Sequence, residues 1–252
     1  TKLSLIEIRS HVWRDVIWIN IDGTAEPFEK VMASTIERWK ELDQKLYHGG
    51  EDGKFSLKVK GNWKLAVENY CESYHLPWVH PGLNSYSRLE DHYHIVKYGS
   101  HSGQGSLVYR QLTDDKGQKF PDFKNLSKKW STGAEYIALY PNVLLGAHRD
   151  HAYAIILLPL SYSETIENVH IYYSQPNTSS SLKKKNKDQW KEVFEEDIFV
   201  VEGMQAGRLG IKFDGGRFSP KMDEPTHCFH DWVASKVNDF RNTNHQITNV
   251  TE

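Results

Sequence analysis

The feature that most constrains the fold is a series of apolar segments in the second half of the chain, joined by very short connections. These segments are rich in Val, Ile, Leu and Tyr, and they cover residues 136–140, 143–147, 153–158 and 165–173. Two of the connections carry the turn-forming pairs Pro141-Asn142 and Asp150-His151. Strands joined so directly run antiparallel, because a parallel pair needs a crossover of roughly a dozen residues or more. The sequence therefore predicts a large antiparallel sheet.

Helices are expected on both sides of these strands in the sequence. Apolar residues recur at helical spacing within 26–46, and again in a long segment that begins at Leu182 or Asp188, ends near Gln205 and is closed by Gly207. Weaker patterns predict helices over 62–74 and 227–241, strands over 6–9, 12–21 and 55–59, and two more strands between 93 and 112. Polar composition predicts a loop over 113–132 and an exposed linker over 177–186. The pattern is that of an α+β fold, and we expect residues 1–252 to form one domain.

Composition narrows the class of protein. The 252 residues carry a formal net charge of −2, which gives no reason to expect nucleic acid or a membrane as partner. No apolar run approaches the roughly 20 residues that cross a bilayer. Only Cys71 and Cys228 are present, too few for a disulfide framework, so we expect a cytoplasmic protein. The 8 Trp, 13 Tyr and 10 Phe are enough to fill a core or to line an apolar ligand pocket.

Two histidines in the first third of the chain, His75 and His80, lie on either side of Pro77. On a continuous helix, an interval of five residues turns the second side chain about 140° away from the first, so both cannot face one ion. Pro77 disfavours helix at Leu76, so His75 can end one helix while His80 lies in the turn or helix that follows. The two imidazoles can then share a metal ion. Alternatively they are unrelated, and one of them caps a helix C-terminus.

A carboxylate for the same ion has two candidates. Glu72 lies three residues before His75, on the same face of a helix. Asp197 is more telling, because it falls within the apolar stripe of the long helix, where an unpaired carboxylate costs several kcal/mol or takes a proton. A bound cation removes this cost, and a buried Arg or a hydroxyl network would also remove it. The neighbouring Glu195 and Glu196 are expected to be ordinary surface acids. Two histidines and one carboxylate would leave open positions on a ferrous ion, as oxygen activation requires.

Two groups of residues around these candidates carry a family resemblance: Asn62-Trp63-Lys64, Glu68-Asn69, Glu72, Tyr74-His75 and His80 in the first, and Glu195-Glu196-Asp197, Glu202 and Gln205 in the second. The first resembles the catalytic-domain signature of the Rieske-type non-haem iron oxygenases, the ring-hydroxylating oxygenase alpha subunits, and the second resembles that family's second signature. The resemblance extends from the strand near Trp13 to the end helix with Phe229-His230-Asp231-Trp232. It implies that His75, His80 and Asp197 bind a mononuclear Fe(II) ion. It also implies a helix-grip fold, in which a curved antiparallel sheet and a long C-terminal helix enclose a substrate cavity.

The resemblance also implies partners. Many family members have Asp at the position of Glu72, where it bridges the iron-site histidine and a ligand of the Rieske cluster in a neighbouring subunit; some relatives, among them monooxygenases of quaternary ammonium compounds, have Glu. A homotrimer is therefore expected. This chain has no paired Cys-x-His motifs for a [2Fe–2S] cluster, so we expect the Rieske domain on a missing segment or on a partner chain. Its start resembles the strands that follow the family's Rieske insert, which favours an excised part of a longer protein.

By this resemblance, the chain is expected to use Fe(II) and O2 to hydroxylate an organic small molecule, aromatic or alkylammonium-like, with electrons from a Rieske cluster and its reductase. Glu72 favours monooxygenation over dioxygenation. Glu72 and Asn69 are the expected catalytic residues beside the metal ligands, and Tyr74 is a weaker candidate for orienting a histidine. The residues expected to line the cavity, unless they are plain core, are Phe194, Ile198, Val201, Leu144, Leu157 and Trp232.

Two other functions remain open from the sequence. The same three ligands could hold zinc in a hydrolase. The fold could also be a non-enzymatic module that binds a hydrophobic ligand, because helix-grip cavities also carry lipids and hormones. Metal content separates the three functions: iron for the oxygenase, zinc for the hydrolase, and no metal for the binding module.

Overall fold

The computed structural model describes residues 5–248, with side chains placed as far as Asn242. Within this range the main sheet has eight antiparallel strands in the order β3-β10-β9-β8-β7-β6-β5, and β4 pairs with β10 on the same edge as β3. The strands are β3 (Tyr47–His48), β4 (Lys54–Val59), β5 (His92–Lys97), β6 (His101–Ser106), β7 (Ala134–Leu139), β8 (Val143–Ala147), β9 (His151–Ser161) and β10 (Glu164–Tyr173). Strands β7 to β10 are consecutive neighbours, which confirms the antiparallel sheet predicted from their short connections.

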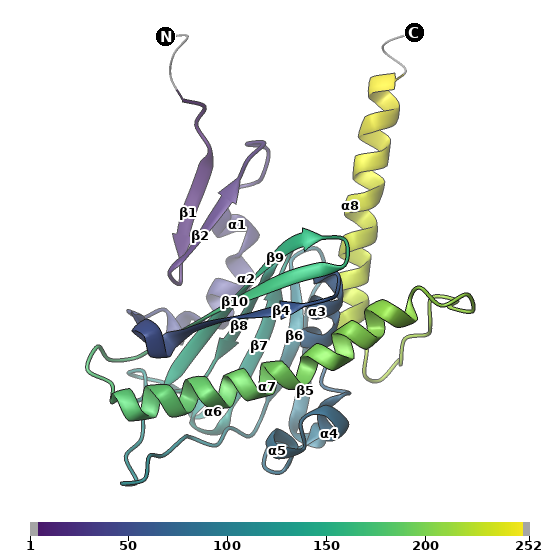
Figure 1. The fold of residues 1–252 in the computed structure, drawn as a ribbon. Coiled ribbons are helices and arrows are strands. Elements are labelled where there is room, and N and C mark those ends of the chain that lie inside the picture. Colours follow the sequence, from purple (N-terminus) through teal and green to yellow (C-terminus); the bar gives the residue numbers. More distant parts are fainter. Residues whose placement is uncertain (1–4, 249–252) are drawn as a thin grey trace.

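The two faces of the sheet are both covered, which explains why its central strands are apolar almost throughout. On β9, Tyr153, Ile155 and Leu157 face one core, whereas Ala154 and Ile156 face the other. This alternation follows from the two-residue repeat of a strand. Helices α3 and α7 and the first part of α8 pack on the first face, while α1, α2 and a separate hairpin pack on the second. In Figure 1 the rest of α8 extends beyond the sheet.

The helices differ greatly in length, and the two longest lie in the last third of the chain. They are α1 (Phe28–Val31), α2 (Ala33–Arg38), α3 (Trp63–Cys71), α4 (Leu76–Val79), α5 (Pro81–Asn84), α6 (Lys128–Thr132), α7 (Ser180–Gly207) and α8 (Glu224–Thr248), with 3₁₀ turns at Lys40–Leu42, Gly50–Gly53 and Leu89–Asp91. Helix α7 crosses the sheet diagonally in Figure 1, and this is the long helix that carries Asp197. The architecture is the predicted α+β arrangement of a large antiparallel sheet with a long helix packed against it.

Several predicted boundaries are wrong, for reasons of turn geometry or tertiary packing. The strand expected over 12–21 is a hairpin of β1 (Arg9–Trp13) and β2 (Val16–Asn20), because Arg14 and Asp15 take positive φ values of 52° and 60° and reverse the chain. The helix expected over 26–46 is broken at Met32, and its last 3₁₀ turn ends at Leu42. Trp39, which precedes that turn, donates its indole N–H to Glu135.

The linker predicted over 177–186 is largely helical, because α7 begins at Ser180. Buried Leu182 and Asn186 hold this first part of the helix against the body of the protein. Helix α8 is also longer than the predicted 227–241, because it begins at Glu224 and continues to Thr248. Between residues 5 and 248, no helix combines the length and apolar character needed to cross a membrane.

Candidate metal centre

The two histidines lie at opposite ends of a single helical turn. Helix α3 ends at Cys71, and Glu72 is extended at φ −115° and ψ 158°. His75 then precedes the first residue of α4, and His80 follows its last. The predicted helix over 62–74 is thus too long. Pro77 also does not terminate it: Pro77 lies in the first turn of α4, where a helix needs no backbone donor from it.

Helix α3 holds the start of this segment firmly in place. Its first turn is capped by the Asn62 side chain, which accepts a hydrogen bond from the backbone N–H of Lys64 at 3.1 Å. At the other end, Cys71 is fully buried beside Ser102 of β6. Beyond Cys71, the Gln104 side chain donates to the carbonyl of Glu72 at 3.0 Å. The sheet therefore fixes the position from which Glu72 and His75 reach the site.

Asp197 enters from α7 and meets both histidines. Its Oδ1 atom lies 3.5 Å from Nε2 of His75 and 3.0 Å from Nε2 of His80. One ligand atom from each of the three residues lies within 4.8 Å of the others. The side chain of His80 is 3% exposed and that of Asp197 is 23% exposed, so the group lies at the inner end of an opening rather than on the surface. The structure brings together all three residues that the sequence singled out as metal ligands.

Each histidine is paired with a carboxylate through its other ring nitrogen. Glu72 Oε1 lies 2.7 Å from Nδ1 of His75, and Glu196 Oε2 lies 2.6 Å from Nδ1 of His80. An ionised carboxylate can only accept, so Nδ1 carries the proton in both rings and the Nε2 lone pairs turn towards Asp197. This is the tautomer that metal ligation requires. The expectation that Glu196 is an ordinary surface acid is wrong: it is at the edge of the buried stripe, and its long side chain reaches back to His80.

The electrostatics of this cluster fit a cation. Oδ1 of Asp197 is buried, and among the described residues no donor makes a hydrogen bond to it. Burial lowers the pKa of His80, but the Asp197 and Glu196 carboxylates outweigh this, and the pKa is above its ordinary value. Donor atoms about 2.1 Å from one ion lie roughly 3 to 3.5 Å from each other when adjacent. The separations from Asp197 to the two imidazoles match that range, so His75, His80 and Asp197 could hold one metal ion.

A cavity of about 50 Å³ lies beside these three residues. Its walls come from α3, α4, α5, α7 and strands β5, β6, β7 and β9, and Asn69 of α3 is part of them. Of the residues predicted to line the cavity, Phe194 does so. The other five are wrong, because they pack within the cores instead: Leu144, Leu157, Ile198, Val201 and Trp232. Tyr74 is 48% exposed and does not line the cavity, so it orients neither histidine from within.

Several cavity residues were not predicted from the sequence. His92 and Gln104, on neighbouring strands β5 and β6, line the cavity and bond to each other, with Nδ1 and Oε1 2.6 Å apart. Tyr153 and Trp190 also line it. None of the four belongs to a local motif, and only the pairing of the strands and the rotation of α7 place them there. Alternation along each strand could have indicated the correct face, but not which residues on that face reach the cavity.

Comparison with known proteins now decides the family. Residues 37–239 match the family model described as the ring hydroxylating alpha subunit, catalytic domain. The chain belongs to this family. In agreement, a crystal structure of the quaternary ammonium Rieske monooxygenase CntA has the same fold: it superimposes with a TM-score of 0.70 over 90% of this chain and 61% of that chain, at 18% identity. Naphthalene 1,2-dioxygenase from Rhodococcus sp. gives a TM-score of 0.62 over 89% of this chain and 64% of that chain, at 12% identity. The predicted family and its helix-grip fold are confirmed.

The matches to sequence relatives cover a smaller share of each relative than of this chain. Putrescine 2-hydroxylase of Bordetella bronchiseptica is 29% identical over 193 residues, which are 68% of this chain and 42% of that protein. The carnitine monooxygenase oxygenase subunit of Escherichia coli is 23% identical over 212 residues, 82% of this chain and 53% of that protein. The chain thus spans about half the length of these curated relatives, so the activity of a whole protein is a matter for proposal.

Proposed function

We propose that this chain carries the mononuclear iron site of an oxygenase, with His75, His80 and Asp197 as the ligands. The observation that supports this most is the carboxylate on each Nδ1, which turns both Nε2 lone pairs towards a buried Asp197 oxygen without a donor. Three acceptors facing one another are unfavourable unless a metal ion lies among them or an imidazole takes a second proton, and a metal ion satisfies all three at once. Two histidines and one carboxylate are also the set that leaves open positions on ferrous iron.

We further propose an alkylammonium compound as the substrate and monooxygenation as the reaction. The relatives named above are a putrescine hydroxylase, a carnitine monooxygenase subunit and a quaternary ammonium monooxygenase, and putrescine and carnitine both carry a cationic nitrogen on an alkyl chain.

The protein's own residues would prepare the reaction. Bound to the three ligands, Fe(II) would supply the binding and activation of dioxygen. Glu72 and Glu196 keep the proton on Nδ1 of each imidazole and fix the plane of the ring. Apolar Leu76 and Val193 line the cavity beside the ligands and limit the water around the reacting atoms. Asn69 and Glu72 remain the proposed catalytic residues beside the ligands.

Electrons would come from a Rieske-type [2Fe–2S] cluster and its reductase. We place the cluster on a further segment or on a partner chain in a homotrimer. Cys71 and Cys228 are free and buried, and burial raises the pKa of both thiols, so they are poor cluster ligands. Glu72 lies beside the exposed rings of Tyr74 and Trp78, which meet edge to face at 5.4 Å. We propose that the cluster approaches on this side, where Glu72 is close to both the surface and His75.

The test is metal content and turnover of protein prepared without oxygen. We expect stoichiometric iron, O2-dependent hydroxylation in the presence of a Rieske reductase system, and loss of iron in Asp197→Ala and His75→Ala. Asp188→Ala is the matched control, because Asp188 lies on the same helix with its side chain 55% exposed and paired with Lys184. Retained iron in either ligand variant would contradict the proposal. Stoichiometric zinc that supports hydrolysis would favour a hydrolase, and bound apolar ligand without metal would favour a binding module.

A further inference from the structure

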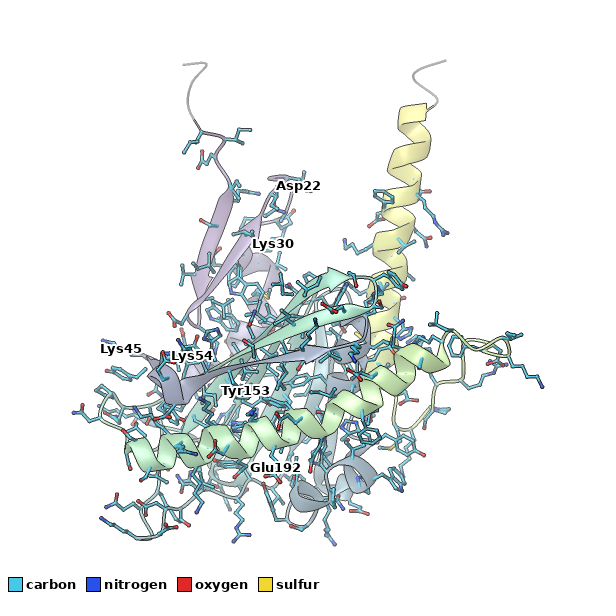
Figure 2. The ribbon with its side chains drawn as sticks, in the orientation of Figure 1. Asp22, Lys30, Lys45, Lys54, Tyr153 and Glu192 are labelled. Atoms are coloured by element: carbon cyan, nitrogen blue, oxygen red, sulfur yellow. The ribbon has the colours of Figure 1, made fainter. Side chains whose placement is uncertain are left out.

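The cavity beside the candidate metal ligands has a wall of aromatic rings. Tyr153 of β9 and Trp190 and Phe194 of α7 line it, and their rings pack against one another with centroid distances of 4.8 to 5.6 Å. Figure 2 labels Tyr153, which lies between the sheet and α7. Tyr70 and Tyr136 extend the wall on either side. We call Tyr153, Trp190 and Phe194 the aromatic wall.

The polar atoms of the aromatic wall are bonded to the protein. The indole N–H of Trp190 donates to Nε2 of His151 at 2.8 Å, and Nδ1 of that histidine is 2.8 Å from Asp150. The hydroxyls of Tyr153 and Tyr70 form a hydrogen bond of 3.2 Å, and the Tyr70 hydroxyl also donates to the carbonyl of Leu145 at 2.9 Å. These bonds fix the rings from behind, and Phe194 has no polar atom. What the aromatic wall offers to a ligand is therefore ring surface, held rigidly in advance.

Apart from the Asn69 amide, the remaining lining offers few groups that would bind a primary ammonium. Asp197 is the one acid among the residues that line the cavity in the described part of the chain, and it belongs to the candidate metal centre. Between residues 5 and 242, no Lys or Arg lines the cavity. His92 and Gln104 are bonded to each other. Burial raises the pKa of the Tyr153 phenol far above its usual range, so the ring stays neutral. A primary ammonium would lose hydrogen bonds to water here and regain few of them.

We propose that Tyr153, Trp190 and Phe194 form a subsite that seats the alkylated ammonium group of the substrate beside the metal centre. The inference rests on the proposed function and narrows its substrate class. A quaternary ammonium has no N–H to satisfy, and its diffuse charge is attracted by the negative face of an aromatic ring, most strongly by Trp. The aromatic wall therefore selects quaternary over primary ammonium compounds, although one sequence relative is named for a primary diamine.

Binding to three probes of similar shape tests the selection. Choline, its neutral carbon isostere 3,3-dimethylbutan-1-ol, and ethanolamine are titrated calorimetrically into the purified protein without oxygen, both before and after Fe(II) is added, so that neither turnover nor bound iron is needed. We expect choline to bind about tenfold more tightly than either other probe, within the range for a desolvated cation on aromatic rings. Equal affinity for choline and its isostere, tighter binding of ethanolamine, or no detectable choline binding would overturn the proposal.

Fluorinated tryptophan separates ring electrostatics from ring shape. Among the described residues that line the cavity, Trp190 is the one tryptophan, so replacing all tryptophans by difluorotryptophan changes the aromatic wall at one position. We expect choline binding to weaken by about three- to tenfold and isostere binding to stay nearly constant. Trp190→Phe should abolish the effect of fluorination, whereas Trp232→Phe, on α8 away from the cavity, should preserve it. A fluorination effect that persists in Trp190→Phe would overturn the assignment to this ring.

The two proposals can fail separately. Protein that holds iron and hydroxylates a substrate, yet binds choline no better than its isostere, would leave the oxygenase function in place and remove the aromatic subsite. Protein that selects choline through Trp190 but holds no iron would keep the subsite and remove the oxygenase. The binding titration and the metal analysis are independent measurements, so each outcome assigns the failure to one proposal.

Discussion

Replacing Glu196 tests whether the carboxylates behind the histidines tune the metal centre. Its Oε2 atom lies 2.6 Å from Nδ1 of His80, and its side chain is 33% exposed. Glu196→Gln keeps an acceptor but removes the charge, while Glu196→Ala removes both. Glu72 makes the equivalent bond to His75, but it also accepts from backbone N–H groups of its own loop. Glu196 is therefore the cleaner probe.

The structure sets the expected size of the effect. A hydrogen bond to a charged group contributes about 1.5–3 kcal/mol, and the partial exposure of Glu196 places it at the lower end. About 1.4 kcal/mol corresponds to a tenfold change in affinity. We therefore expect metal binding to weaken by about tenfold in Glu196→Gln and towards a hundredfold in Glu196→Ala, as for other groups that support a metal ligand.

The assay is a competition titration with Fe(II) without oxygen, repeated with Co(II), whose spectrum reports the ligand geometry. Glu195→Gln is the matched control, because Glu195 is the adjacent residue on α7, has its side chain 50% exposed and pairs with Lys191 at 3.4 Å. We expect this control to bind metal as the unchanged protein does. If Glu196→Gln and Glu195→Gln bind Fe(II) equally well, the carboxylate does not tune His80 and the reasoning is wrong.

Three further predictions concern stability, each read from urea denaturation of metal-free protein. Burial and the nearby Asp197 charge raise the pKa of Glu167 to about 8, from an ordinary value of 4.5. Between these pH values the folded state holds a proton that the unfolded state has lost, so the free energy of unfolding should fall as pH rises from about 4.5 to 8, by on the order of 3–5 kcal/mol. Glu167→Gln should flatten this pH profile. An unchanged pH dependence in the variant would refute the raised pKa of Glu167. Leu157→Ala, at a position with no exposed surface, should cost about 2–5 kcal/mol, and a loss well below that range would mean the core closes around it. Gly103→Ala should lower the free energy of unfolding by about as much or more, because an added Cβ would lie 2.0 Å from a backbone oxygen of β7. Gly82→Ala is the control, because a Cβ there meets open space. Equal denaturation midpoints for the two glycine variants would contradict this prediction.

The sheet was predictable because its cause is local. Apolar strands joined by two or three residues can only pair with their neighbours, so the antiparallel order of β7 to β10 follows from the sequence. The start of α7 was not predictable in this way. Its first residues are Ser and Lys, and they become helical because Leu182 and Asn186 are buried against other parts of the chain.

The chemistry of the site was likewise divided between sequence and tertiary structure. Imidazole and carboxylate are groups that bind iron, and an acid within an apolar helical stripe needs a partner, so residue chemistry made His75, His80 and Asp197 candidates, and the family resemblance then implied them as the ligand set. Only the folded chain decided that Glu196 supports His80 and that Trp190 faces the cavity. Those two roles depend on how α7 is rotated against the sheet and on how far each side chain reaches. Residue spacing within one helix fixes neither, because both are set by contacts with strands and loops far away in the sequence.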